Sequence, residues 1–395
     1  MAPAKQWVVR YKHFVTHDQQ SDHVARVNSL SADSTMPFSA KINRTTKFSI
    51  GSDTKGYLAE FDIITKVLLE ALPEVRFFPT TVLPHVSIVT QKEAPWSLAR
   101  LSNTGPLTGS KFAYTYRTDA SGAGVIAYII DTGINEKHVE FESRASKGPI
   151  FVEGGATSSK DDVVGHGTHV AGTIGGKTYG VAKNVTLVGI KVFDDHTGSA
   201  STIDIIKALE WVVTDVYSSN PPKKAVANLS LGGDISPAMD AAIAAAVRQG
   251  IIVVVAAGNK DNSDNFSPAR EPLAITVGAT DINDNRASFS NWGRKVDIFA
   301  PGVNIMSAWI AAPGHPTTNK ETKRIDGTSM ASPHVAGVAA TILSDKQHTV
   351  INNAQDVIGT ILINADKSGV GNLDNPALLK VNPKFTTIAS IAQAK

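Results

Sequence analysis

The sequence contains no cysteine among its 395 residues. Disulfide bonds, thiolate nucleophiles and cysteine-ligated metals are therefore excluded, and composition leaves the redox compartment open. A large excess of one charge is also missing, because 38 basic and 36 acidic residues give a net charge of +2. We therefore expect neither a nucleic acid nor a charged membrane surface as a partner.

Long apolar runs and a leader pattern are missing too. The longest apolar run, residues 251–257, is far too short to cross a bilayer, so we expect no membrane partner. Residues 1–7 lack the basic start and apolar core of a signal peptide, so either such a signal has been removed or the protein is not exported by that route. The rest of the composition, 42% apolar and 19% charged, is that of an ordinary globular protein with a large core.

The first part of the chain predicts a small α+β unit. Short apolar strands alternate with amphipathic helices in the order β-α-β-β-α-β, which is ferredoxin-like. We expect the strands at residues 7–11, 47–50, 56–61 and 75–78, and the helices at 19–30 and 63–72. Residues 80–94 show no clear period and are interpreted as a linker.

From about residue 122 the pattern changes to apolar, β-branched runs separated by amphipathic helices. The expected strands are 125–130, 185–192, 225–231 and 251–256, and the expected helices are 201–217, 237–249 and 353–365. Strands of this kind are buried on both faces, which predicts an α/β fold with a parallel sheet and helices on both faces. Ligand sites in such folds lie at the carboxyl ends of the strands, where Asp131 follows the first strand.

The stretch Gly327–Gly337 predicts a helix with Ser329 in its first turn. Small residues dominate the stretch, and Pro333 is tolerable because it lies near the helix start. A helix start offers free N–H donors, so a serine there can attack an acyl carbon while its own amide binds the oxyanion. Most serines in this position are helix caps, and the catalytic interpretation needs a base and an acid elsewhere.

Both partners occur in ordered settings. Asp131 ends an apolar strand, and His166 and His169 occur in the motif Gly-His-Gly-Thr-His. Either histidine can serve as the base for Ser329, and the residues alone do not decide between them. The chain order Asp, His, Ser is that of subtilisin.

These three blocks resemble the subtilisin superfamily of serine peptidases, and the resemblance is greatest to the fungal proteinase K-like branch, over residues 7 to about 379. The resemblance implies a serine endopeptidase that acts through an acyl-enzyme on Ser329, with His166 as base and Asp131 orienting it. It also implies that Asn259 donates to the oxyanion, although a Gly-Asn pair is otherwise typical of a turn. A subtilisin-like parallel sheet is then preceded by a small ferredoxin-like α+β propeptide domain.

The same resemblance divides the chain into a propeptide, residues 1–88, and a peptidase domain, residues 89–395. Residues 94–100 resemble the start of the mature enzyme, which puts the activating cut near Ile88–Val89. The propeptide is expected to act as an intramolecular inhibitor, and an independent accessory domain is the alternative. Protein or peptide substrates and a monomeric enzyme are expected. The family implies secretion, whereas the lack of cysteine and of a signal pattern leaves a vacuolar or intracellular enzyme open.

Substrate-binding residues follow from the resemblance. The walls of the specificity pocket and the strand that pairs with the substrate are expected at Ser230, Leu231, Gly232, Gly233, Ala256, Ala257 and Gly258, and at Gly198, Ser199 and Ala200. Glycine and alanine walls leave a wide slot that suits large uncharged side chains. The family has a second glycine where this chain has Ala200. Lys260 is expected near the rim, where it is either a solvated lysine or a group that favours acidic side chains.

No cofactor is expected for the chemistry, but a structural Ca²⁺ site is suggested by the family. The matching ligands are the carbonyls of Pro272 and Ala274 and the carboxylate of Asp297, which are oxygen donors of the kind calcium prefers. Asp297 as a buried salt-bridge partner is the alternative. A catalytically silent relative is disfavoured by the intact motifs, and an α/β-hydrolase esterase by the absence of a Gly-x-Ser-x-Gly elbow at Ser329.

Overall fold

The computed structural model describes most of the chain beyond residue 87 and several segments before it. The described residues are 5–11, 15–16, 18–23, 25, 46–50, 54–61, 75–79, 88–152, 159–263, 266–312, 314–315, 318–345, 354–365 and 370–371. The chain divides into two compact units, residues 1–85 and 86–395, which are described separately.

The first unit contains a four-stranded antiparallel sheet in the order β2-β3-β1-β4. Its strands are β1 (Lys5–Tyr11), β2 (Thr46–Ile50), β3 (Thr54–Phe61) and β4 (Val75–Pro79). All four strand predictions are confirmed, and this strand order is the one expected of a ferredoxin-like unit. Residues 18–23 are helical where the first helix was expected, and the second expected helix, 63–72, lies outside the described residues.

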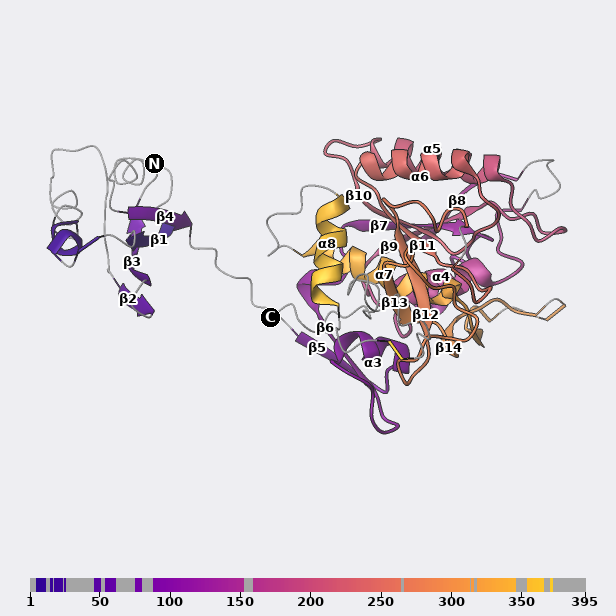
Figure 1. Cartoon of the computed structure of the whole chain (residues 1–395), viewed down its shortest axis with the longest axis horizontal. Coiled ribbons are helices and arrows are strands. Elements are labelled where there is room, and N and C mark those ends of the chain that lie inside the picture. The colour runs from indigo at the N-terminus through magenta and orange to yellow at the C-terminus, as the bar shows by residue number, and fades with distance from the viewer. Residues whose placement is uncertain are drawn as a thin grey trace. The chain divides into compact units, whose positions relative to one another are not determined.

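The second unit is built on a seven-stranded parallel sheet in the order β13-β12-β11-β10-β7-β9-β8 (Figure 1). Four strands occur where β-branched runs predicted them: β7 (Val125–Asp131), β9 (Thr186–Lys191), β10 (Lys224–Leu229) and β11 (Ile252–Ala256). Three strands were not predicted: β8 (Ala145–Ile150), β12 (Ile275–Thr280) and β13 (Ile298–Pro301). Asp131 is the last residue of β7, at the carboxyl edge of the sheet.

Helices cover both faces of this sheet, as expected (Figure 1). On one face lie α4 (His166–Gly175) and α7 (Thr328–Ser344), and on the other lie α5 (Thr202–Val216) and α6 (Pro237–Arg248). The small residues of α7 allow close packing, because a Cβ on Gly337 would lie only 2.6 Å from the Cβ of Val181. Ser201 and Ser236 accept backbone N–H groups at the starts of α5 and α6, which satisfies donors left free there.

The remaining elements surround this core. They are α3 (Trp96–Ser102), β6 (Ala113–Arg117), β14 (Ile305–Ala308), β15 (Thr322–Ile325), α8 (Ala354–Asn364) and the short 3₁₀ turns Thr118–Ala120 and Val139–Phe141. The last helix was expected at 353–365 and is confirmed within one residue at each end. No helix within the described ranges is both long and apolar enough to span a membrane.

The interpretation of residues 80–94 as a linker is wrong for their second half. Residues Ile88–Lys92 form β5, which pairs with β6 in an antiparallel ribbon. Gln91 anchors this strand, since its amide donates to the Thr178 carbonyl at 2.9 Å and accepts from Lys183 Nζ at 2.7 Å. Burial lowers the pKa of Lys183 to about 7. The strand carried no periodic signal because most of its side chains are exposed.

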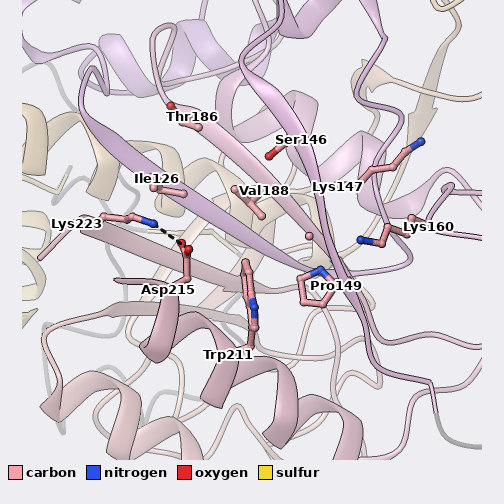
Figure 2. A pocket seen from close by; sticks show the side chains of 11 residues that line it. Ile126, Ser146, Lys147, Pro149, Lys160, Thr186, Val188, Trp211, Asp215 and Lys223 are labelled. Carbon is pink, nitrogen blue, oxygen red and sulfur yellow. Dashed lines mark hydrogen bonds and ion pairs between the residues drawn. The ribbon is translucent and has the colours of Figure 1, made fainter. Parts of the chain in front are cut away.

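A cavity of about 520 Å³ lies beside α5, against β8 and the first halves of β7 and β9 (Figure 2). Ile126 and Val188 are part of its apolar lining, and the Lys223 Nζ to Asp215 Oδ1 ion pair, at 2.9 Å, closes one end. Asp131 lies at the opposite end of β7 from Ile126. None of the proposed catalytic residues lines this cavity.

Candidate active site

Asp131 and His166 are brought together at the carboxyl edge of the sheet. Asp131 is fully buried, and its Oδ1 accepts hydrogen bonds from the Thr132 N–H and from His166 Nδ1, both at 2.7 Å. His166 is the first residue of α4 and follows Gly165. Only glycine fits before it, because φ is +93° and a Cβ would lie 2.6 Å from the Trp309 ring. The contact with Asp131 holds the proton on Nδ1 and leaves Nε2 as the acceptor.

The charge around His166 favours its protonated form. Burial of the ring lowers the pKa, but the Asp131 carboxylate raises it by charge and by its hydrogen bond, and Asp162 adds to the rise. The net result is a pKa above the ordinary value of 6.5. The imidazolium that forms when His166 takes a proton is therefore stabilised by this pair of carboxylates.

Asp162 was not predicted from the sequence. Its buried carboxylate accepts from the N–H groups of Val164, Gly165 and Thr168 and from the hydroxyls of Thr132 and Thr168, at 2.6 to 3.1 Å. These five contacts tie the turn before His166 to the start of α4 and to the residue after Asp131. Asp162 therefore fixes the relative positions of the aspartate and the histidine.

His169, the competing base, lies in the core. It is fully buried, its Nε2 donates to the Ile305 carbonyl at 2.9 Å, and its ring packs edge-on against Trp309. Burial lowers its pKa to about 3. A ring in this position has no access to a substrate, so the geometry favours His166 as the base.

Ser329 lies in the first turn of α7 and is partly exposed. Its hydroxyl donates to the Ser230 carbonyl at 3.1 Å, and the Ser230 hydroxyl donates back to the Ser329 carbonyl at 2.8 Å. Ser329 is thus held through Ser230 rather than hydrogen-bonded to His166. Contacts between nucleophile and base are often long without substrate and tighten when it binds.

Asn259 is held in one orientation by Thr328, a second residue that the sequence did not single out. The Asn259 side-chain oxygen accepts from the Thr328 N–H and from the Thr328 hydroxyl, both at 2.9 Å. The same hydroxyl accepts from the Gly258 N–H at 3.1 Å. Because the oxygen of the carboxamide is committed, its NH₂ group is left as the donor beside the start of α7.

A cavity of about 270 Å³ adjoins Ser329 and Asn259. Its lining contains the catalytic candidates Ser329 and Asn259, Lys260 and most of the expected wall residues: Leu231, Gly232, Gly233, Ala256, Ala257 and Gly258. Four lining residues were not expected from the sequence: Phe266, Ala269, Asn291 and Thr328. Ser230 lies behind Ser329 rather than in the lining. Gly198, Ser199 and Ala200 are outside this cavity and precede α5, in the loop that follows β9 at the same edge of the sheet as Asp131.

Asp297, the carboxylate suggested for calcium, is a largely enclosed acid. One of its oxygens accepts from the Thr276 N–H at 2.9 Å, and burial raises its pKa to about 6, against the opposing effects of that bond and of Lys295. Such a carboxylate is stabilised by a cation, which fits a calcium ligand. Over the ranges that the structure describes, no group of three or more His, Cys, Asp or Glu side chains could hold a metal, so a site here needs backbone carbonyls.

The fold and the site together define a serine hydrolase of the subtilisin-like class. The profile of the Subtilase family (peptidase S8) matches residues 122–377. The chain belongs to this family and is a subtilisin-like serine peptidase, whose substrates are proteins.

Relatives and a solved structure agree with this assignment. Alkaline protease 1 of Aspergillus clavatus is 44% identical over 308 residues, which cover 78% of this chain and 72% of that protein. Proteinase R of Parengyodontium album is 41% identical over 331 residues, covering 83% and 78%. The cuticle-degrading protease of Metarhizium anisopliae is 47% identical over 277 residues, covering 69% and 66%. The crystal structure of a cold-adapted subtilisin-like serine proteinase matches with a TM-score of 0.63 and 38% identity, over 75% of this chain and 98% of that one.

Proposed function

We propose that this peptidase hydrolyses internal peptide bonds through an acyl-enzyme on Ser329. The observation that carries the proposal is the Asp131–His166 hydrogen bond, at the same sheet edge as a helix-start serine beside a cavity. Ser329 Oγ attacks the peptide carbonyl carbon and gives its proton to His166 Nε2. The C–N bond then breaks, and His166 returns the proton to the leaving amine. Water, deprotonated by His166, then attacks the acyl-enzyme. This step releases the carboxylic acid and restores Ser329.

The negative oxygen formed in each step needs donors that are already in position. The backbone N–H of Ser329 lies in the first turn of α7, where helix amides have no partner within the helix. The Asn259 NH₂ group, oriented by Thr328, is the second donor. A donor of this kind contributes about two to three orders of magnitude to turnover.

We propose that the 270 Å³ cavity binds the side chain before the scissile bond. Its glycine and alanine walls leave room for large uncharged side chains, which gives a broad specificity. We assign Gly198, Ser199 and Ala200 to the pairing of an extended substrate backbone. The proposal for this segment rests on its place after β9 at the active edge of the sheet.

We propose that the enzyme is made as a self-processing zymogen, with residues 1–88 as propeptide and inhibitor and 89–395 as a monomeric peptidase. The division of the chain into units at residues 85 and 86 supports a separate first domain. We further propose that the enzyme acts outside the cell. A relative named for degrading cuticle supports this, since cuticle lies outside the fungus.

The chemistry requires no cofactor, and we propose calcium only as a structural ion bound by Asp297 and the carbonyls of Pro272 and Ala274. Bound calcium would offset the charge of the enclosed carboxylate.

Asp297→Asn should change thermal stability in opposite directions with and without calcium. The raised pKa of Asp297 means that stability is lost as pH rises from the ordinary value of 3.8 through about 6. At pH 8 in chelator, we therefore expect the variant to melt about 3 °C above wild type. In millimolar calcium, wild type gains stability and the variant does not. Equal melting temperatures for wild type in chelator and in calcium would show that no such site exists.

The reaction itself is tested by covalent labelling of the purified enzyme with a fluorophosphonate, which reacts with an activated serine. We expect peptide mass analysis to find the label on Ser329. The labelled fraction should match the fraction of activity that is lost, measured as cleavage of a peptide p-nitroanilide with phenylalanine before the scissile bond. His166→Ala should remove the labelling. Turnover that survives full labelling, or a label on another residue, would contradict the assignment of the nucleophile.

A further inference from the structure

We propose that Lys260 makes the specificity pocket select for charge, so that it accepts an acidic side chain before the scissile bond and rejects a basic one. This inference rests on the proposed endopeptidase function and narrows its substrate class. A glutamate before the bond would meet the ammonium group inside the cavity, whereas a lysine or arginine would meet a like charge.

Lys260 is the one charged residue in the lining of the 270 Å³ cavity as the described part of the chain forms it. The other lining side chains are small, apolar or neutral polar, so nothing in that lining offsets the lysine charge. The adjacent acid, Asp261, is committed elsewhere, because its Oδ1 accepts from Arg286 Nη1 at 2.8 Å. The pocket therefore has a net positive field at its rim.

Lys260 is held beside the cavity through both its backbone and its side chain. Its backbone N–H donates to Asn291 Oδ1 at 2.9 Å, and Asn291 also holds the Ala257 wall through a 2.9 Å bond to the carbonyl. Its Nζ lies 4.9 Å from the centre of the Phe266 ring, which is itself part of the lining. This cation–π contact keeps the ammonium group of the exposed lysine beside the pocket wall.

The strength of the attraction between Lys260 and an acidic substrate side chain depends on how much water lies between the two charges. An exposed ion pair contributes little, because water and salt screen it. A substrate side chain in the cavity displaces water from between the two charges, which strengthens their attraction. We expect Lys260→Ala to lower the ratio of kcat/KM for glutamate over glutamine before the scissile bond by about 3- to 10-fold, a range that spans weak and moderate ion pairs.

The experiment compares three peptide p-nitroanilides that differ only in the residue before the bond: glutamate, glutamine and lysine. Glutamine matches glutamate in shape, so the ratio isolates charge from fit. Lys260→Arg should keep the wild-type ratio, and Lys260→Glu should reverse the preference between the glutamate and lysine peptides. The glutamate preference of the wild type should weaken as ionic strength rises from 20 to about 500 mM, because screening lengths shorten.

Two further variants test the anchoring. Phe266→Leu keeps an apolar wall but removes the ring, and we expect the glutamate-to-glutamine ratio to fall toward that of Lys260→Ala. Lys207→Ala is the matched control, because it removes the same charge from an exposed position on α5 and should leave the ratio unchanged. Asp264 lies outside the described residues, so its charge is tested separately with Asp264→Asn. A glutamate-to-glutamine ratio that rises in this variant would still support Lys260 as the group that selects the charge of the substrate.

The outcomes separate this inference from the proposed function. If wild type cleaves a phenylalanine peptide but Lys260→Ala leaves the glutamate-to-glutamine ratio unchanged, the charge selection is wrong and the peptidase assignment stands. If the ratio falls equally in Lys260→Ala and Lys207→Ala, the effect belongs to net charge and the pocket assignment is overturned. If wild type cleaves none of the peptides, the proposed function fails, and the charge selection fails with it.

Discussion

Ser329→Ala should lower kcat for a peptide substrate by about 10⁶-fold and should leave the full-length chain of 395 residues uncut. The variant loses the only atom that bonds to the acyl group, while its helix start and Asn259 still bind the oxyanion. Residual hydrolysis of roughly 10³-fold over water is therefore expected. The wild type, in contrast, should shorten near residue 88 as it becomes active.

Intact mass and peptide cleavage, followed over the same time course, check both parts of this prediction. Ser110→Ala is the matched control, because it makes the same substitution at an exposed position before β6, outside the catalytic motifs. His166→Ala should lose about as much activity as Ser329→Ala, and the double variant no more than either, since the two residues act as a unit. A Ser329→Ala chain that still shortens by itself would refute self-processing through this serine.

Asp131→Ala should lower kcat by about 10⁴-fold and move the acid limb of the pH profile to lower pH. The base acts when neutral, so activity appears as pH rises through the pKa of His166. Asp131 raises that pKa by its charge and its hydrogen bond, against the effect of burial. Without the carboxylate the pKa falls, and the residual activity should persist to more acidic conditions than in the wild type.

The profile of kcat/KM between pH 4 and 9 measures this shift, because it reports groups of the free enzyme. Asp119→Ala is a suitable control, since it removes a carboxylate paired with Arg117 outside the site. A loss of activity with an unmoved acid limb would mean that Asp131 orients His166 without stabilising its charge. An acid limb that moves to higher pH would contradict the electrostatic account.

Much of the fold was predictable because its central strands are buried on both faces. The runs around Ile129 and Val254 are continuous and β-branched, and periodicity identifies such strands well. The strand β8 was missed because it is an edge strand whose sequence, Ala145–Ile150, includes lysine, glycine and proline. The strand β13 is only four residues long, which gives too little pattern to recognise.

The site shows the same division between local and distant signals. Asp131, His166 and Ser329 each stand in a local motif, so the sequence could single them out. Thr328 and Asp162 could not be assigned, because their roles depend on partners far along the chain. Thr328 meets Asn259 across 69 residues, and Asp162 meets Thr132 across 30. Hydrogen-bond partners at such separations leave no spacing that a sequence pattern can detect.

The ribbon formed by β5 and β6 bears on the order of events in the proposed maturation. The proposed cut between Ile88 and Val89 falls where these residues pair with Arg117 and Tyr116. A peptide bond that is already part of one ribbon has to leave it before it can enter a cleft as an extended substrate. The start of β5 would therefore peel away first, while the contacts of Gln91 with Thr178 and Lys183 hold the rest of the strand. After the cut, the new amino terminus can pair with β6 again. The β5–β6 ribbon would therefore open once, for the cleavage, and then form again in the mature enzyme.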